Sequence, residues 1–195
     1  VPGFVLHAFI RRMLVTWQHP ENALFDDGAI LISQDGKRFC QETQWPDREI
    51  AIANQPDKKA YILMDEVLTK RYSSWPNFIS TAPKIAYAYV NDYLRLRPDI
   101  AIAGSIKEIA TKRMLPTNTL RKVLKESGLK GEQWTLLGPV KAYFTTTEGG
   151  VAIDRSFRAL NEEAKPIPGL FAVGQNGLGG QILWGHGLHI AWAMT

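Results

Sequence analysis

The stretch of this sequence best suited to chemistry is a glycine-rich segment at residues 169–187, GLFAVGQNGLGGQILWGHG, in which seven of nineteen residues are glycine. A short apolar strand is predicted just before the turn, at Leu170–Val173, and a helix is predicted to start near Gly180. This order of elements directs free backbone N–H groups and a positive helix dipole at an electron-rich ligand, and glycine lets that ligand approach the backbone. A tight turn with close helix packing is the alternative, but five glycines at positions 174, 177, 179, 180 and 185 favour a ligand.

Several other kinds of site are excluded by spacing and composition. The dinucleotide fingerprint G-x-G-x-x-G after a first strand is absent, so any pyrophosphate site is expected outside this chain. One cysteine, Cys40, excludes a disulfide framework and a cysteine cluster for zinc, and it leaves the cellular compartment undecided. His186 and His189 have no carboxylate or cysteine near them in the sequence, so packing is favoured over a metal and no metal site is expected.

The composition is that of an ordinary globular protein of one or two domains. The 195 residues are 45% hydrophobic, and 23 basic against 19 acidic residues give a net charge of +4 without a block of like charges. We therefore expect no nucleic-acid partner, and no apolar run approaches the length of about 18 residues that a membrane span requires. The start lacks methionine and the end falls within an apolar predicted helix, so we expect a piece of something longer.

The hydrophobic pattern predicts a mixed fold, α+β passing into α/β. A hairpin is expected near 28–40, with Asp35-Gly36 in its turn, and Asp65 is a candidate N-cap. The predicted helices cover 48–54, 65–72, 82–96, 105–113 and 117–127, and the predicted strands cover 134–137, 140–146, 151–154 and 170–173, with a surface loop at 161–168. The strand Leu170–Val173 is expected to be buried on both faces of a parallel sheet, and to need partner strands from elsewhere.

Four motifs together give a specific resemblance that covers nearly the whole chain. They are GAILISQDGKRF from Gly28 with Glu42 behind it, TEGGVAID from Thr147, PIPGLFAVG from Pro166, and the LGG turn from Leu178. In this order they resemble the C-terminal part of the FAD-dependent fumarate reductase and succinate dehydrogenase flavoprotein family, which includes 3-ketosteroid dehydrogenases.

The resemblance implies FAD as the cofactor, and an FAD-binding domain that is interrupted by a capping domain. Residues 1–144 would be mostly cap, residues 145–195 would be the returning end of the FAD domain, and the N-terminal FAD fold would be missing from this chain. Gly174 and Gln175 would contact the FAD ribose. The other implied cofactor-binding residues are Gly149 and Gly150, and Gly179, Gly180, Gln181 and Ile182 at the pyrimidine edge of the flavin, where a helix N-terminus stabilises the reduced ring.

For the reaction, the resemblance implies hydride transfer between the flavin and a C–C bond beside a carbonyl or carboxylate. A second group must give or take a proton on the other carbon. In fumarate reductases an arginine followed by an acidic residue does this, shortly after the G-K-R-F hairpin. Arg48-Glu49 matches that pair with a two-residue insertion around Trp45 and Pro46. Without the resemblance, a surface arginine at the start of a helix is the favoured interpretation.

Several positions differ from the fumarate-specific pattern. The expected histidine is Thr146, one expected arginine is Gly177, and the upstream Thr-Glu pair and arginine are Glu21, Asn22 and Phe25. Losing two arginines removes two charge-assisted clamps for a dicarboxylate. The tyrosine expected in ketosteroid dehydrogenases is Leu136, and nearby Tyr143 is its candidate substitute. Arg48, Thr146 and Tyr143 are therefore the candidate catalytic residues.

These differences predict a small-molecule substrate that is apolar or weakly charged, at a site where Phe25, Trp45, Leu136 and Tyr143 replace charge. The competing hypothesis is a non-catalytic binding module derived from the cap. We expect the isolated chain to bind no FAD stably and to be inactive, because the phosphate-binding half is absent. Apolar surface around Leu170–Val173 is expected to favour self-association.

Overall fold

The computed structural model describes residues 3–5, 8, 20–82, 86–142 and 149–177 of the chain. The chain divides into two compact units, Val1–Ala142 and Tyr143–Thr195, which are called unit 1 and unit 2 below. Both helices and strands are present, so the predicted mixed fold is confirmed at this level. Assignment of the two units to a cap and to an FAD domain stays a prediction.

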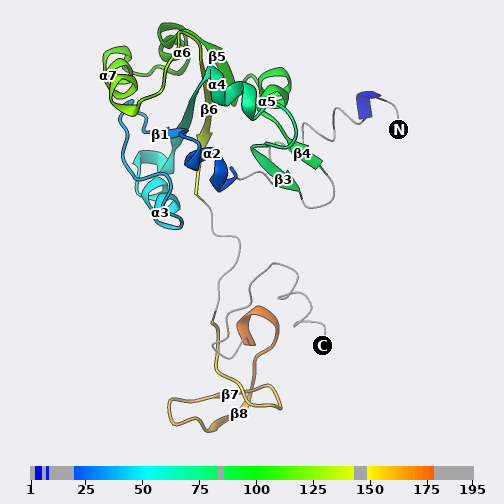
Figure 1. Cartoon of the computed structure of the whole chain (residues 1–195). Helices are drawn as coiled ribbons and strands as arrows, with labels where there is room; N and C mark the ends of the chain where they lie inside the picture. Colours follow the sequence, from blue (N-terminus) through cyan, green and yellow to red (C-terminus); the bar gives the residue numbers. More distant parts are fainter. Residues whose placement is uncertain (1–2, 6–7, 9–19, 83–85, 143–148, 178–195) are drawn as a thin grey trace. The chain divides into compact units, whose positions relative to one another are not determined.

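Unit 1 is built on a four-stranded sheet in the order β1-β2-β6-β5 (Figure 1). All three strand pairs are antiparallel. The strands are β1 (Ile30–Ile32), β2 (Ala60–Asp65), β6 (Trp134–Val140) and β5 (Ala101–Gly104). A separate two-stranded ribbon pairs β3 (Ser80–Ala82) with β4 (Ala86–Ala88).

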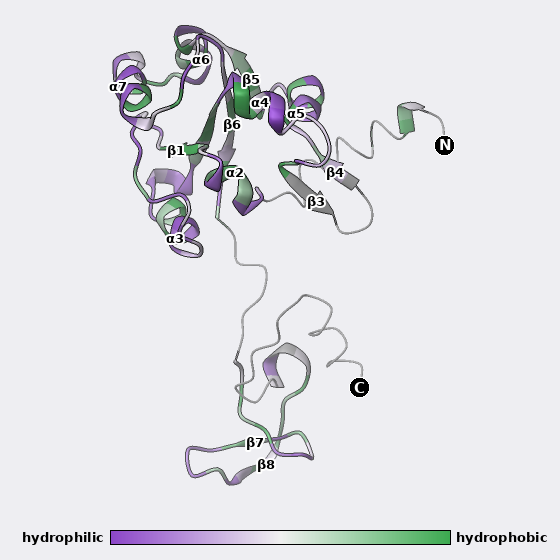
Figure 2. Cartoon of the chain, in the orientation of Figure 1, coloured by the Kyte–Doolittle hydropathy of each residue, from purple (hydrophilic) through white to green (hydrophobic). Residues whose placement is uncertain are grey.

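Both faces of the four-stranded sheet are covered by helices, which explains why every residue of β1 and β2 is buried. Along β2, Ile62 and Met64 join one core cluster while Tyr61 and Leu63 join the other, because successive strand side chains point to opposite faces. The first cluster packs against α2 (Asn22–Asp26), α3 (Asp47–Ala53), α4 (Glu66–Arg71) and α5 (Val90–Leu96), and the second against α6 (Ile106–Arg113) and α7 (Thr117–Ser127). Figure 2 shows the amphipathic colouring of α3, α6 and α7 that this arrangement requires. A short 3₁₀ turn, η1 (Pro56–Lys58), leads into β2.

The structure differs from the predicted elements in three respects. The predicted helix 82–96 begins only at Val90, and the ribbon β3–β4 precedes it. Strands β2 and β5 were not predicted, because an apolar run such as Ala60–Met64 suits a buried helix segment as well as a strand buried on both faces. The predicted strand 151–154 makes only an isolated bridge, between Ile153 and Ala159.

Local capping signals were predicted with better success. Asp65 caps α4 by accepting a hydrogen bond from the backbone N–H of Leu68 at 2.8 Å, and Gly128 ends α7 in the left-handed region. The hairpin near 28–40 is present, with Gly36 at φ +70 in its turn, although its second arm makes only the bridge Ile32–Arg38.

Unit 2 contains the strands β7 (Arg158–Leu160) and β8 (Pro166–Phe171), paired antiparallel, and the 3₁₀ turn η2 (Gly174–Gly177). The prediction that Leu170–Val173 is a strand buried in a parallel sheet is wrong for this structure. Every residue of β8 is exposed, with Leu170 at 48% and Phe171 at 62%, because β7 is its partner within the described residues. Strand β8 also begins inside the predicted loop 161–168. The predicted bare apolar surface is therefore present at this strand.

Helix α2, which reaches the site described below, is fastened to α4 by a carboxylate. The Tyr72 hydroxyl donates to Asp27 Oδ2 at 2.8 Å, and Arg71 pairs with the same oxygen at 2.9 Å. The hydrogen bond from Tyr72, followed by Arg71, lowers the pKa of Asp27 below its ordinary value, while burial and Asp27 raise the pKa of Tyr72.

We predict that Tyr72→Phe lowers the free energy of unfolding by about 1–2 kcal/mol at pH 7, because a hydrogen bond to a charged group is lost. Because the pKa of Asp27 is lower in the folded state, its carboxylate stabilises the fold at pH values above its unfolded-state pKa. This contribution is lost as the pH falls through its folded-state pKa. The gap between wild type and variant should therefore shrink at about pH 2. Urea denaturation at both pH values measures this, with exposed Tyr87→Phe as the control. A gap that does not change with pH contradicts the prediction.

Candidate functional site

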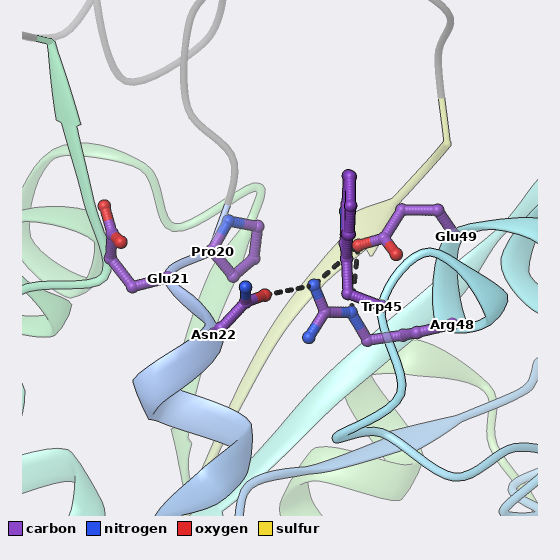
Figure 3. A pocket seen from close by; sticks show the side chains of 6 residues that line it. All are labelled: Pro20, Glu21, Asn22, Trp45, Arg48 and Glu49. Atoms are coloured by element: carbon purple, nitrogen blue, oxygen red, sulfur yellow. Dashed lines mark hydrogen bonds and ion pairs between the residues drawn. The ribbon is translucent and has the colours of Figure 1, made fainter. Parts of the chain in front are cut away.

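A pocket of about 310 Å³ opens in unit 1 beside the start of α2 and the start of α3. Its lining is Pro20, Glu21, Asn22, Trp45, Arg48 and Glu49. The structure thus brings the predicted Arg48 together with three positions singled out from the sequence, Glu21, Asn22 and Trp45. These residues come from two segments more than twenty positions apart, which meet only in the folded chain (Figure 3).

Arg48 is the centre of this site, and its side chain is almost fully removed from solvent. The residue is 3% exposed, which excludes the interpretation of a surface arginine. Its Nε and Nη2 donate to Glu49 Oε1 at 2.9 and 2.6 Å, and Nη2 also donates to Asn22 Oδ1 at 2.8 Å. Nη1 donates to the backbone carbonyl of Glu42 at 3.0 Å. These contacts fix the plane of the guanidinium against the pocket.

Below the guanidinium lies the ring of Phe25, with the Arg48 carbon Cζ 4.2 Å from the ring centroid. Such a cation–π contact stabilises a cation that has lost its water. Phe25 is itself 4% exposed, on the buried face of α2. Phe25 therefore supports Arg48 from inside the fold and does not line the pocket.

The position of Arg48 depends on Glu42, a buried carboxylate that sequence reasoning recorded only as part of a motif. Glu42 is 2% exposed, and its Oε1 accepts the backbone N–H of Leu31 in β1 at 3.0 Å. Arg38 also reaches both carboxylate oxygens, with Nε at 2.8 Å from Oε1. Arg38 therefore forms an ion pair with the buried carboxylate of Glu42. The same residue that anchors the hairpin thus presents its carbonyl to Arg48.

Cys40 lies close to this network but is unsuited to nucleophilic chemistry. Burial, followed by the charge of Glu42, raises the pKa of its thiol to about 11. A thiol with that pKa is protonated at neutral pH, and the thiolate is the reactive form.

Besides Phe25, one residue predicted at the substrate site is buried in a core, and six other predicted site residues lie outside the described ranges. Leu136 is 0% exposed within the second core cluster, so the expectation that it faces a ligand is wrong. Tyr143 and Thr146 lie outside the described residues, as do Gly179, Gly180, Gln181 and Ile182. Glu49 was noted only as a partner of Arg48, and its place in the lining follows from its position at the start of α3.

In unit 2 the structure brings two of the predicted cofactor segments together. The backbone N–H of Val151 donates to the carbonyl of Asn176 at 2.8 Å, which sets the Gly149-Gly150 pair beside the η2 turn that begins at Gly174. All three glycines have positive φ, +101, +88 and +59. A side chain added at Gly149 would meet nothing within 4 Å, so its backbone borders open space.

At Gly177 the backbone leaves no room for any side chain. A Cβ there would overlap the backbone carbonyl of Ala172. The turn in this chain therefore requires glycine at a position where the resemblance expected arginine.

The described residues contain neither a candidate metal site nor a candidate membrane span. Among the described residues, no group of three or more histidine, cysteine, aspartate or glutamate side chains could hold a metal ion. Within the same part of the chain, no helix has the length and apolar character needed to cross a membrane.

Comparison with known proteins identifies the family. The family model described as FAD binding domain matches residues 12–181, most of the chain. This chain therefore belongs to the FAD binding domain family, a family of FAD-dependent oxidoreductases that includes fumarate reductase-like proteins, and FAD is its cofactor.

Its relatives are longer proteins. It is 26% identical over 158 residues to a fumarate reductase of Schizosaccharomyces pombe, covering 78% of this chain and 31% of that protein. It is 28% identical over 162 residues to the fumarate reductase (cytochrome) of Shewanella frigidimarina, covering 78% and 27%. The chain thus spans less than a third of the length of these curated relatives.

Solved structures share the fold. The open conformation of a flavocytochrome c3 fumarate reductase superposes with a TM-score of 0.55 at 23% identity, over 82% of this chain and 29% of that one. The 3-ketosteroid-Δ4-(5α)-dehydrogenase of Rhodococcus jostii RHA1 gives a TM-score of 0.50 at 20% identity, over 78% and 33%. The mixed helix and sheet architecture is therefore that of the flavoprotein fumarate reductases.

We predict that Glu42→Gln lowers the free energy of unfolding by about 1–3 kcal/mol, because a buried charge-assisted network loses its charge. Urea denaturation measures the change. Glu126→Gln is the matched control, since Glu126 is exposed and its pairing with Lys122 spans 4.0 Å; it should change stability by less than about 0.5 kcal/mol. Equal stability of the two variants would remove Glu42 from its anchoring role.

Proposed function

We propose that this chain is part of an FAD-dependent oxidoreductase that reduces an activated carbon–carbon double bond, with Arg48 as the proton donor. The observation that carries the proposal is a buried arginine held by four hydrogen bonds at the wall of a pocket. Arginine side chains are normally exposed, and a buried guanidinium is stable only with partners that offset its desolvation.

The chemistry divides between the cofactor and this pocket. When bound, FAD supplies the redox step, exchanging a hydride with one carbon of the substrate through its N5. Arg48 protonates the neighbouring carbon. A guanidinium carries N–H donors and no acceptor, and a carbanion beside a carbonyl is basic enough to take a proton from it. The reverse dehydrogenation would need a base at this position, so the proposed direction is reduction.

The described glycines of unit 2 fit a cofactor that packs closely on backbone. Gly149 borders open space and Gly174 adopts a positive φ beside it, as close approach to the main chain requires. We propose that Gly149, Gly150, Gly174 and Gln175 contact FAD. The same role is proposed for Gly179, Gly180, Gln181 and Ile182, which lie outside the described residues.

The proposed substrate is not a C4 dicarboxylate. Arg48 is already paired with Glu49, and the residues against it are the amide of Asn22 and the ring of Phe25. Trp45, 59% exposed, adds an apolar wall to the pocket. These features support a substrate that is uncharged or weakly charged, and Tyr143 and Thr146 remain candidates to contact it.

The division into two units supports a capping role for unit 1 and a place for unit 2 at the end of an FAD-binding domain. We propose that the phosphate-binding part of that domain lies outside these 195 residues, since the matched residues make up only 31% and 27% of the two relatives. The chain alone would then hold no FAD. Stoichiometric flavin absorbance in the purified chain would overturn this part of the proposal.

A non-catalytic binding module is the second candidate. One observation favours it, namely that unit 1 encloses two core clusters of its own and needs no cofactor to complete them. Turnover by the complete FAD-loaded protein would exclude this candidate, and its absence for every activated alkene would favour it.

We predict that Arg48→Ala in the complete FAD-loaded protein lowers turnover by about 10²–10⁴-fold, the usual contribution of a positioned acid. Flavin absorbance should stay unchanged, because Arg48 lies in unit 1 and not among the proposed FAD contacts. Arg48→Lys should also be impaired, since an ammonium cannot hold the planar contacts to Asn22, Glu49 and the Glu42 carbonyl together.

Arg121→Ala is the control for these variants, because Arg121 is an exposed residue of α7. It should retain full turnover. Loss of less than threefold in Arg48→Ala would remove Arg48 from the mechanism.

A further inference from the structure

The charge balance of the pocket is opposite to what a dicarboxylate needs. Of its lining residues, Arg48 carries one positive charge and Glu21 and Glu49 carry two negative charges. The Arg48 guanidinium and the Glu49 carboxylate form an ion pair at 2.6 Å and cancel each other's charge. The negative charge of Glu21 is then the net charge of the lining. An anionic ligand group entering this cavity is repelled, and a hydrogen-bond donor is attracted.

Asn22 has a fixed orientation that chemistry dictates. A guanidinium has donors and no acceptor, so the Asn22 atom 2.8 Å from Arg48 Nη2 must be the amide oxygen. The two N–H groups of Asn22 Nδ2 are then available to a ligand, because no described residue accepts a hydrogen bond from them. Asn22 lines the pocket, so it offers donors to a ligand acceptor such as a carbonyl oxygen.

Glu21 supplies the complementary acceptor. It is the N-cap residue of α2, yet its side chain makes no capping hydrogen bond. Its backbone N–H donates to the carbonyl of Ile79 at 2.6 Å, which fixes the main chain, and Glu21 is one of the residues that line the pocket. In Figure 3 Glu21 lies on the other side of Pro20 and Asn22 from Arg48.

We propose that the pocket recognises an uncharged, carboxamide-type ligand, with a carbonyl oxygen at Asn22 and an N–H donor at Glu21. This inference rests on the proposed function, in that the pocket is taken as the substrate site, and it names the substrate class. Glu21 and Asn22 are the residues that determine specificity. A carboxylate in the same place would face Glu21 and would have to displace Glu49 from Arg48.

Three compounds with one carbon skeleton test the proposal: fumarate, its monoamide fumaramate and its diamide fumaramide. Trp45 lines the pocket and reports binding to the 195-residue chain by its fluorescence, with Trp45→Phe identifying its share of the signal. We expect fumaramide to bind about tenfold or more tightly than fumarate, the size of one unfavourable charge contact near the surface, with fumaramate between them.

The variants Glu21→Gln and Asn22→Ala sharpen the test. Glu21→Gln removes the charge and should reduce the preference for fumaramide at least threefold, mainly by improving fumarate binding. Asn22→Ala should weaken fumaramide without improving fumarate. Equal binding of the three compounds, tighter binding of fumarate, binding of none, or an unchanged preference in Glu21→Gln would each overturn the proposal.

Turnover separates this proposal from the proposed function. In the complete FAD-loaded protein with a reduced dye as electron donor, kcat/KM should follow the same order, fumaramide above fumaramate above fumarate. Amide-selective binding without reduction of any of the three compounds would contradict the proposed reductase activity and leave the specificity intact. Reduction with fumarate preferred would contradict the specificity alone.

Discussion

The site depends on one constraint: the positive guanidinium of Arg48 and the negative carboxylate of Glu42 must both be buried in unit 1. Glu42 and Arg48 are 2% and 3% exposed, and each is stable there only because every neighbour supplies a partner. The Glu42 carboxylate accepts a hydrogen bond from a backbone N–H of β1. The backbone carbonyl of Glu42 accepts a hydrogen bond from Arg48. Strand β1, the hairpin and the pocket are therefore connected through Glu42, so a change in one of them alters the others.

The fold supplies what this constraint requires. Helix α2 brings Asn22 and Phe25 to one side of Arg48, and α3 carries Arg48 and Glu49 on its first turn. Both helices pack on one face of a sheet whose other face is covered by α6 and α7, so neither can move without opening a core. Arg48 keeps its orientation by virtue of this packing, which would preorganise the proposed proton donor before a substrate arrives.

What could be predicted from the sequence was mostly local. The cap at Asp65 and the end of α7 at Gly128 depend on a few adjacent residues and were placed correctly. The central strand β2 was missed, because burial on both faces removes the alternation by which a strand is recognised. Arg48 followed from a motif. Its contacts with Asn22 and Phe25 join residues more than twenty positions apart, and the sequence named those positions as departures from a pattern without showing that they meet.

The central claim is that Arg48 donates the proton to a substrate in this pocket. A crystal structure of the complete FAD-loaded protein with an unreactive analogue of fumaramide tests it most directly. The account predicts the analogue within the pocket, with the carbon to be protonated about 3–3.5 Å from a guanidinium nitrogen of Arg48 and the neighbouring carbon facing the flavin. An analogue bound elsewhere, or held with Arg48 remote from both carbons, would contradict the account.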